Sequence, residues 1–496
     1  MPVVSRWKLR AATLLFPPAG MWLLWSQPGS VWSRLIGTLG IVLYTPVYIV
    51  LMLTLMVKFT GLQIEWRGGM LPYPTYHKTV PQYDALEKHR SQQVKTAPAI
   101  PSPTAIAATP PYWTDLRGPA RDGVYAERSL NLKWPAAGPK LLWKQPVGGG
   151  YAAFVVANGL AFTIEQRRDE EAVVAYEVET GREAWVHRYK ANFQEGMGGD
   201  GPRATPTWHA GRIYSLGAEG DIKCLNAVDG RMLWSNNVLG DGRSANLMYG
   251  MSTSPLIVDD LVIVQGGDAG GNGSWVLAYD RMTGSLRWQA MKDKAAYASP
   301  MLVTLAGERQ ILVVGGFRAA GLSPKDGKLL WEFAHPVPYD NNIAQPIITG
   351  TNTLILSAGY GTGSTALAFD SKDGHLTPRV LWKNKFLKSK FSSAVLWQGH
   401  LYGLDEDILT CINAVTGERK WKDERYGYGQ LLVADGHLII LSGSGELALV
   451  RATPEKHDEL VRIPAIEGKT WNNVALGGGR LLIRNSVEMA CYDLLP

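Results

Sequence analysis

The sequence predicts an all-β fold, an eight-bladed β-propeller with four-stranded blades, preceded by a transmembrane helix and a proline-rich linker. Three observations support this prediction. An eleven-residue pattern returns along the chain from residue 175 onward, the 496 residues include 54 Gly and 18 Trp, and an uncharged apolar run lies near the N-terminus. Many glycines together with many tryptophans are typical of short strands joined by tight turns and packed through large aromatic side chains.

The first 60 residues predict a membrane anchor. Residues 35–57 carry no charge and contain one proline, Pro46, so this run is long enough for a transmembrane helix. The earlier apolar run, residues 11–25, is shorter and contains Pro17 and Pro18. We expect this shorter run to lie at the membrane surface or to re-enter the membrane, and a second span is the alternative.

The side of the membrane depends on residues 11–25. If the chain crosses once, the four basic residues that precede residue 35 stay inside and the bulk of the chain lies on the periplasmic side. If residues 11–25 also span, the bulk returns to the cytoplasm together with Lys58 and Arg67. The count of basic residues does not separate the two cases. The short, proline-containing run favours one crossing and therefore a periplasmic propeller.

Residues 61–112 predict a linker. Prolines recur through this stretch among charged, Ser, Thr and Ala residues, as at Pro72, Pro81 and Pro103. Such a composition favours an extended chain that buries little apolar surface. We therefore divide the chain into a membrane anchor (1–60), a linker (61–112) and a propeller (113–496).

The repeat is defined by residues 175–185. It reads small, large apolar, acidic or Asn, two free positions, Thr or Asp, Gly, three free positions, Trp. This pattern predicts a β-hairpin, because Asp or Asn can accept hydrogen bonds from turn amides and Gly supplies the positive φ. Further copies begin at Cys224, Ala278, Gly321, Ala368, Cys411, Ala448 and Cys491, and in the copy at Ala368 the Trp arrives about four residues late.

The spacing of these copies predicts eight blades. Their mean separation is about 45 residues, which is within the range for a four-stranded blade, and each unit also contains an earlier hairpin. At Leu141 to Trp143 a Trp-bearing strand has no hairpin before it, and at Glu488 to Asp493 a first strand has nothing after it. Pairing these two strands would close the ring and remove its open edges.

The Trp at the end of each copy predicts a structural column, in which each ring buries a large apolar surface against a neighbouring blade. The eighth place, near Val461, has no Trp. The column consists of Trp143, Trp185, Trp234, Trp288, Trp331, Trp382 and Trp421.

From Trp113 to the C-terminus the chain resembles the bacterial PQQ-like repeat β-propellers of the quinoprotein alcohol dehydrogenase-like superfamily, which include the outer-membrane protein assembly propellers. The repeat carries the resemblance, and residues 113–123 look like the opening segment of predicted exported members. In the dehydrogenases the resemblance implies PQQ on the propeller axis, under a vicinal disulfide, over a Trp and beside calcium. In the assembly propellers it implies the same blades without a cofactor. This chain has no adjacent cysteines.

The inner strands predict a ligand-binding funnel. Alignment of the eight inner strands places five aromatic residues in one column and mostly polar residues two positions later, and period 2 puts both columns on one strand face. The alternative is a solvated axis with packed rims. The first column is Tyr151, Arg203, Ser252, Tyr297, Ile343, Phe391, Tyr428 and Trp471, and the second is Ala153, Thr205, Ser254, Ser299, Gln345, Ser393, Gln430 and Asn473.

The glycine-rich residues 196–203 favour a lid over this funnel, with Arg203 as an anion contact. Residues 266–273 and Asp405 to Asp407 are typical of turns, and calcium binding is their alternative. No Ser, His and acid set can be assembled from spacing, so no catalytic residue and no metal ligand is predicted.

Composition leaves three classes of function open. Net charge is +6, but basic and acidic residues alternate, which does not indicate a nucleic-acid surface. The first hypothesis is a membrane-anchored, non-catalytic scaffold that binds a protein or an extended polymer. The second is a quinoprotein oxidoreductase that holds PQQ and calcium in the funnel, with Trp471 or an aromatic neighbour as the stacking surface. The third is a small-molecule or glycan sensor.

Overall fold

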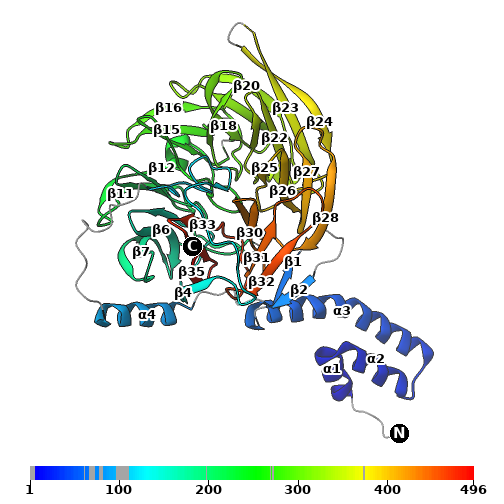
Figure 1. The fold of residues 1–496 in the computed structure, drawn as a ribbon. Coiled ribbons are helices and arrows are strands. Elements are labelled where there is room, and N and C mark those ends of the chain that lie inside the picture. The colour runs from blue at the N-terminus through cyan, green and yellow to red at the C-terminus, as the bar shows by residue number, and fades with distance from the viewer. Residues whose placement is uncertain are drawn as a thin grey trace. The chain divides into compact units, whose positions relative to one another are not determined.

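The computed structural model describes residues 6–60, 62–65, 73–76, 82–96, 111–196, 198–268, 270, 273–372 and 375–496. Contacts between residues divide the chain into two compact units, residues 1–77 and residues 78–496. Figure 1 shows helices in the first unit and a ring of radial sheets in the second. Each unit is described by itself.

The N-terminal unit consists of three helices and one hairpin. Helices α1 (Arg6–Leu15) and α2 (Pro17–Ser26) are separated at Phe16, and α3 (Val31–Thr60) continues through Pro46 without a break. Among the described residues, α3 is the one helix that is long and apolar enough to cross a membrane. Strands β1 (Leu62–Glu65) and β2 (Tyr73–Tyr76) pair antiparallel after it.

Residues 11–25 are not one continuous helix. The tyrosine hydroxyls of α3 donate hydrogen bonds back to the end of α1, from Tyr44 to the Leu14 carbonyl (3.2 Å) and from Tyr48 to the Leu15 carbonyl (2.7 Å). These bonds satisfy two of the carbonyls that a helix end leaves open. The break at Phe16 and the return onto α3 agree with a folded-back segment, and the placement of this segment in a membrane stays a prediction.

The second unit is an eight-bladed propeller, so the predicted fold class is confirmed. Every blade is an antiparallel sheet whose strands run in order from the axis outward. The innermost strands are β5 (Val155–Ala157), β9 (Thr207–His209), β13 (Leu256–Val258), β17 (Met301–Leu305), β21 (Ile347–Gly350), β25 (Val395–Trp397), β29 (Gln430–Ala434) and β33 (Ala475–Gly477). The second strands are β6 (Leu160–Arg167), β10 (Arg212–Leu216), β14 (Leu261–Gln265), β18 (Glu308–Val314), β22 (Thr353–Ala358), β26 (His400–Asp405), β30 (His437–Leu441) and β34 (Arg480–Arg484).

The repeat hairpins form the outer half of each blade. The third strands are β7 (Glu170–Glu177), β11 (Asp221–Asn226), β15 (Val276–Asp280), β19 (Arg318–Leu322), β23 (Gly363–Lys372), β27 (Ile408–Asn413), β31 (Glu446–Arg451) and β35 (Glu488–Asp493). The outermost strands are β8 (Glu183–Lys190), β12 (Met232–Asn237), β16 (Leu286–Ala290), β20 (Leu329–Ala334), β24 (His375–Asn384), β28 (Arg419–Arg425), β32 (Glu459–Pro464) and β4 (Lys140–Pro146). A short helix, α5 (Val238–Gly242), and a 3-10 turn, η2 (Pro338–Asp340), lie in the connections between blades.

The ring closes as predicted. Strand β4, from the start of the propeller, pairs antiparallel with the last strand, β35, and Trp143 stands opposite Cys491. The eighth blade therefore takes three strands from the end of the chain and one from its beginning. A short strand, β3 (Val124–Tyr125), adds parallel to the inner strand β29. This pairing completes the eighth blade, so the ring has no open end between its last and first blades.

The turn chemistry of the repeat is also confirmed. The Asp280 carboxylate accepts hydrogen bonds from the amides of Met282 and Thr283, both at 2.9 Å. Asn413 caps its own turn in the same way. The glycine that follows has positive φ, as at Gly284 (75°). Side-chain acceptors and a left-handed glycine thus fix outer hairpins such as those at Asp280 and Asn413 locally.

Each repeat contains a β-bulge that explains its small residue. In six of the eight blades the register shifts between the small and the large apolar positions, and the small residue stands directly opposite the Trp, as with Cys224 and Trp234 or Cys411 and Trp421. A bulky partner at that position would compete with the indole for space. In the fifth blade Trp382 pairs with Ala366 rather than with Ala368, because the β23–β24 hairpin is extended at its turn end.

The Trp side chains join consecutive blades. The Trp234 indole N–H donates to the Arg281 carbonyl in the next blade (3.1 Å), and its ring lies so close to Gly284 that an added Cβ would come within 2.7 Å. The same indole-to-carbonyl bond is made by Trp143, Trp185, Trp288 and Trp421. The indole of Trp331 instead bonds Gln310 within its own blade. The repeat glycine therefore serves both its turn and the tryptophan of the preceding blade.

The core lies between neighbouring sheets. The second and third strands of every blade are almost fully buried, and the three free cysteines, Cys224, Cys411 and Cys491, lie there with no exposed surface. Burial raises the pKa of the Cys411 and Cys491 thiols to about 12. These cysteines are compact core residues, as expected for their place in the repeat.

Helix α4 (Tyr83–Thr96) belongs to the propeller unit. Leu86 is buried, His89 Nε2 lies 2.7 Å from Gln145 Oε1, and Arg90 donates to the Pro146 carbonyl at 3.1 Å. Figure 1 shows α4 beside the sheets of the first and last blades. This helix lies within residues 61–112, over which a linker is predicted. The division into three segments stays a prediction.

Candidate functional site

The polar column is a belt between blades. The Ala153 amide donates to Thr205 Oγ1 at 2.9 Å, and the Ser254 amide donates to Ser299 Oγ at 2.9 Å. The Ser299 amide then donates to Gln345 Oε1 at 2.6 Å, and Gln345 itself donates to the Ser299 carbonyl at 3.1 Å. These side chains hold the backbones of neighbouring inner strands. We expected them to line a funnel, and in the structure Gln345 is buried within this belt.

The belt continues into the last blades with a shift in the eighth. The Gln345 amide donates to Ser393 Oγ at 2.9 Å, and Gln430 Nε2 donates to the carbonyls of Phe391 (2.7 Å) and Trp471 (3.0 Å). In the eighth blade the bridging residue is Asn472, which donates to the Ala152 carbonyl at 3.0 Å. The aligned residue Asn473, one position later, is half-buried.

Residues 113–123, which we call the plug, fill the axis at the level of the inner strands. The Val156 amide donates to the Trp113 carbonyl (2.7 Å), and the Val433 amide donates to the Gly123 carbonyl (2.9 Å). The Trp113 side chain is fully buried. The plug therefore pairs with the inner strands of the first and seventh blades and becomes part of the core.

Two buried arginines anchor the plug. Arg121 donates to Asp115 and to the carbonyls of Ser254 (3.1 Å) and Pro300 (2.8 Å), and it also bonds the Pro255 carbonyl. Arg117 donates to the carbonyls of Ala394 (2.9 Å) and Leu431 (3.3 Å), and burial lowers its pKa to about 10. Each guanidinium spans neighbouring blades through its fixed set of donors. The opening motif is thus a structural clamp.

The aromatic column forms a collar at the end of the axis where the inner strands begin. The Trp471 ring is stacked on Phe391 (4.8 Å between centroids) and on Tyr151 (5.7 Å). Tyr428 meets Phe391 edge-on at 4.9 Å. We call these four side chains the aromatic collar. Their distances are those of favourable aromatic pairs, so four of the predicted funnel residues do come together.

Three cations border the aromatic collar. Lys469 Nζ lies 4.0 Å from the Trp471 ring centroid, and Lys390 Nζ lies 4.8 Å from that of Tyr428. The Arg203 guanidinium carbon lies 5.4 Å from the centroid of Tyr151. Burial lowers the pKa values of Lys390 and Arg203. The sequence predicted Arg203 but missed both lysines.

The glycine-rich loop is tied to the aromatic collar. The Tyr151 hydroxyl and Lys469 Nζ both donate to the Gly198 carbonyl, at 2.5 and 2.7 Å. Arg203 donates to the carbonyls of Gly199 and Gly201 within its own loop. Arg203 therefore organises the loop in this structure. The use of this loop as a lid stays a prediction, and Met197 lies outside the described residues.

The remaining column residues lie on the other side of the axis. The Tyr297 ring lies 5.8 Å from that of Tyr249, and its hydroxyl accepts a long hydrogen bond from the Tyr249 amide (3.4 Å). Ser252 is half-buried, and its hydroxyl has no hydrogen-bond partner among the described residues. Asn341 donates to the Tyr360 hydroxyl at 3.3 Å. Tyr249, Tyr360 and Asn341 were not predicted and complete the rim.

The residues present do not fit PQQ with calcium. The face of Trp471, which would stack on a quinone, is engaged by the protein's own Phe391 ring and by Lys469. Calcium needs several carboxylate or carbonyl oxygens, whereas the groups at the collar are aromatic rings and cations. Among the described residues no group of three or more His, Cys, Asp or Glu is arranged to hold a metal ion. Asp405, a predicted calcium alternative, is paired with Lys388 and Lys422.

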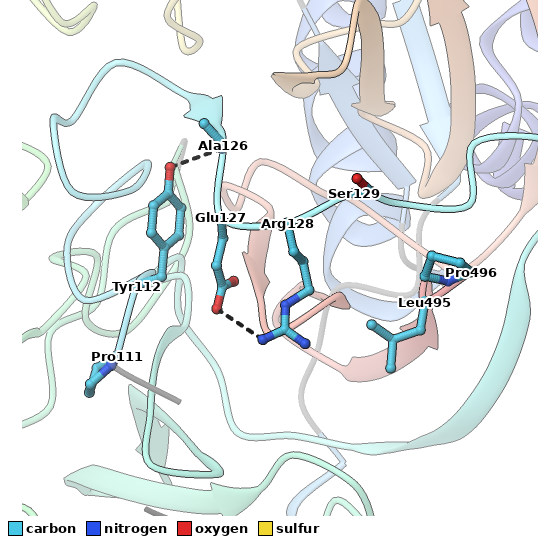
Figure 2. Close-up of a pocket in the computed structure, with 8 residues that line it drawn as sticks. All are labelled: Pro111, Tyr112, Ala126, Glu127, Arg128, Ser129, Leu495 and Pro496. Atoms are coloured by element: carbon cyan, nitrogen blue, oxygen red, sulfur yellow. Dashed lines mark hydrogen bonds and ion pairs between the residues drawn. The ribbon is translucent and has the colours of Figure 1, made fainter. Parts of the chain in front are cut away.

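A separate open cleft lies where the propeller chain begins and ends (Figure 2). The Tyr112 hydroxyl accepts a hydrogen bond from the Ala126 amide at 2.9 Å, and Glu127 pairs with Arg128 at 3.8 Å. Glu127 also accepts from the Gly478 amide at 2.7 Å. Tyr112 and Glu127 are thus engaged with protein groups, and the cleft separates residues 111–129 from Leu495 and Pro496. Its lining is Pro111, Tyr112, Ala126, Glu127, Arg128, Ser129, Leu495 and Pro496.

The closed ring, the Trp-bearing repeat and the axial plug define a PQQ-like repeat propeller. A family model described as outer membrane protein assembly factor BamB matches residues 169–423, just over half of the chain. The chain therefore belongs to this BamB-like family of PQQ-repeat propellers.

Individual relatives agree with this family and differ in activity. Outer membrane protein assembly factor BamB of Burkholderia pseudomallei is 23% identical over 306 residues, which cover 59% of this chain and 71% of that protein. Polyvinylalcohol dehydrogenase of a Pseudomonas species is 26% identical over 284 residues, 48% of this chain and 43% of that protein. The structure of a quinohemoprotein alcohol dehydrogenase from Pseudomonas putida HK5 superposes with a TM-score of 0.55 at 12% identity, over 79% of this chain and 81% of that one. That likeness shows the fold alone.

Proposed function

We propose that this protein is a membrane-anchored, non-catalytic scaffold of the cell envelope whose propeller binds another protein on the periplasmic side. One observation carries the proposal. The axial position that a redox cofactor would need is filled by the aromatic collar and its lysines. Membership of a family described by an assembly factor supports a protein partner rather than a small substrate.

The N-terminal unit supports the anchored part of the proposal. Helix α3 has 30 residues, and most of its apolar side chains, such as Ile36, Leu43 and Val50, are exposed within the unit. An exposed apolar helix of this length is suited to a bilayer. With one crossing, the basic N-terminal residues stay inside and the propeller reaches the periplasm.

The competing function is that of a PQQ-dependent oxidoreductase. The similarity to polyvinylalcohol dehydrogenase is the reason to test it. The full-length protein in detergent is titrated calorimetrically with PQQ and calcium, alongside a Trp471→Ala variant. We expect no saturable heat from either protein, with circular dichroism showing that both are folded. Saturable binding by the wild type that is lost in Trp471→Ala would replace the scaffold with a quinoprotein.

A glycan or small-molecule sensor is the third candidate. Binding to the native state must raise the thermal midpoint of unfolding as ligand concentration rises. We expect no such shift with neutral oligosaccharides, because they offer no charge to the buried lysines at the collar. A saturating upward shift would favour the sensor.

A further inference from the structure

Two buried lysines at the aromatic collar form no close ion pair with a carboxylate of the described residues. Lys390 and Lys469 are 9% and 6% exposed. Counting the described residues alone, each ammonium has one hydrogen bond, from Lys390 to the Tyr428 hydroxyl (3.2 Å) and from Lys469 to the Gly198 carbonyl (2.7 Å). Within the described part of the chain neither Nζ has a carboxylate oxygen within 4.0 Å. Glu406 and Asp407 attract Lys390 only at longer range than an ion pair, and since an ammonium carries three donors, both lysines keep donor capacity that no described residue uses.

Aromatic rings surround both ammonium groups. Lys390 Nζ lies 4.9 Å from the ring centroid of Tyr360 and 5.5 Å from that of Phe391. Lys469 Nζ lies 5.3 Å from the centroid of Tyr151. Ring faces attract a cation, but they do not neutralise its charge. The rings therefore hold the two lysines in place while leaving their charge for an anion.

The two lysines belong to one site. Lys390 lies over Phe391, Phe391 is stacked on Trp471, and Lys469 lies over Trp471. The pair thus flanks a single continuous ring stack. The nearby Arg203 uses two of its donors on loop carbonyls, which hold it beside Tyr151 at the edge of the same site.

An exposed aromatic rim leads to this site. Tyr339 is 78% exposed, and its ring lies 5.5 Å from Tyr360 in an edge-on arrangement. Phe317, in the turn between β18 and β19, is also exposed. The connections that enter the inner strands and the turns between second and third strands lie at the same end of an antiparallel blade. The rim and the collar therefore share one face of the propeller, and large exposed aromatic side chains are typical of protein-binding surfaces.

We propose that this face receives an acidic segment of the partner protein, with one carboxylate bound by Lys390, another bound by Lys469, and an apolar or aromatic side chain packed on Tyr339 and Tyr360. The inference rests on the proposed scaffold function and names the chemistry of its partner. A carboxylate would supply the charge-assisted hydrogen bonds that the lysines lack. A neutral ligand would leave both ammonium groups desolvated and unpaired.

The test is calorimetric titration of the full-length protein in detergent with a capped octapeptide of alternating glutamate and tyrosine. The matched peptide replaces every glutamate with glutamine. We expect saturable binding of the glutamate peptide and about tenfold weaker binding of the glutamine peptide. Because charge pairs are screened, the affinity should also fall as salt rises.

Three variants locate the binding. Lys390→Met and Lys469→Met should each weaken the glutamate peptide about tenfold, since each removes a charged donor without adding volume. The control is Lys325→Met, which alters an exposed lysine in an outer-hairpin turn. Two independent lysines keep the test decisive if one variant fails to fold.

The inference is overturned if the folded protein does not bind the glutamate peptide or binds the glutamine peptide equally well. It is also overturned if Lys390→Met and Lys469→Met both bind the glutamate peptide with the wild-type affinity. Lysine-dependent binding of an anionic polysaccharide such as alginate in preference to the peptide would also overturn it. These outcomes leave the scaffold function standing. Saturable binding of PQQ with calcium, in contrast, would overturn the scaffold function itself.

Discussion

The contact between each repeat glycine and the Trp of the preceding blade gives a sharp prediction for Gly284→Ala. Gly284 has a φ of 75°, and an added Cβ would lie 2.7 Å from the Trp234 ring. The ring cannot retreat freely, because Trp234 is 8% exposed and its indole is bonded to Arg281. The positive φ costs about 1 kcal/mol, and the overlap adds about 1–3 kcal/mol, so we expect a loss of about 2–4 kcal/mol.

The matched control is Gly211→Ala. Gly211 has nearly the same φ, 78°, but a Cβ there meets no atom within 4 Å. This variant should therefore lose only the backbone cost of about 1 kcal/mol. The difference between the two variants isolates the contact between blades.

Chemical unfolding followed by circular dichroism measures this difference as a shift in denaturant midpoint, and thermal unfolding at a fixed scan rate gives a second reading. For a unit of about 400 residues, 3 kcal/mol corresponds to a shift of about 4 °C. Equal destabilisation by Gly284→Ala and Gly211→Ala would refute the reasoning, because the tryptophan would then contribute nothing to the glycine requirement.

Two further predictions concern buried charges. Arg121→Met should lower the free energy of unfolding by about 3–5 kcal/mol, because it leaves Asp115 without its buried partner. The control, Arg128→Met, alters a long and partly exposed ion pair and should lower it by less than about 1 kcal/mol. Similar thermal midpoints for the two variants would contradict the role of Arg121 as a clamp. Burial raises the pKa of Glu171 from 4.5 to about 7, although hydrogen bonds from Tyr189 and Ala218 act in the opposite direction. Between pH 4.5 and about 7 the folded protein therefore keeps a proton on Glu171 that the unfolded chain loses. The stability that this group contributes is complete below about pH 4.5 and is lost as pH rises to about 7. Glu171→Gln should remove up to about 3 kcal/mol of this decline in the free energy of unfolding, measured by chemical denaturation between these pH values. The same pH dependence in the variant and the wild type would contradict the raised pKa.

The blades could be predicted from the sequence because each one is specified locally. The Asp or Asn, the Gly and the Trp of a repeat all act within one hairpin and its neighbour, as at Asp280, Gly284 and Trp288. Closure by Trp143 and Cys491 followed from counting half-hairpins, without any long-range information. Local turn chemistry repeated along a chain leaves few alternative folds.

The axis was predicted less well, because its contacts join residues of different blades. The alternation of side chains along a strand placed Gln345 and Tyr428 on the same face of their respective inner strands. It did not indicate that the Gln345 side chain would hydrogen-bond the backbone of the neighbouring inner strand. One further step of the same alternation reaches Asn341 and Lys469, so these residues had a usable signal. Lys390 is one residue before Phe391, so the same alternation places it on the opposite strand face. The three-dimensional path of its loop brings it to the collar.

Helix α4 shows a different limit. Among the side chains of this helix that the structure describes, Leu86 is the buried apolar one, and polar pairs such as Arg90 with Glu183 (3.4 Å) supply other contacts. Residues 83–96 therefore carry no clear apolar stripe, which is the pattern by which a packed helix is usually recognised. Proline-rich flanks reinforced the prediction of an extended linker.

The most direct test of the scaffold account is photocrosslinking in living cells, with a benzophenone amino acid placed at Tyr339 or at Val415. Both side chains are strongly exposed, 78% and 77%, but Tyr339 lies on the rim of the aromatic collar and Val415 lies in an outer-hairpin turn. We predict a discrete adduct with one envelope protein from Tyr339 and none from Val415. No adduct from either position, with the propeller shown to be folded in the membrane fraction, would contradict a protein-binding scaffold.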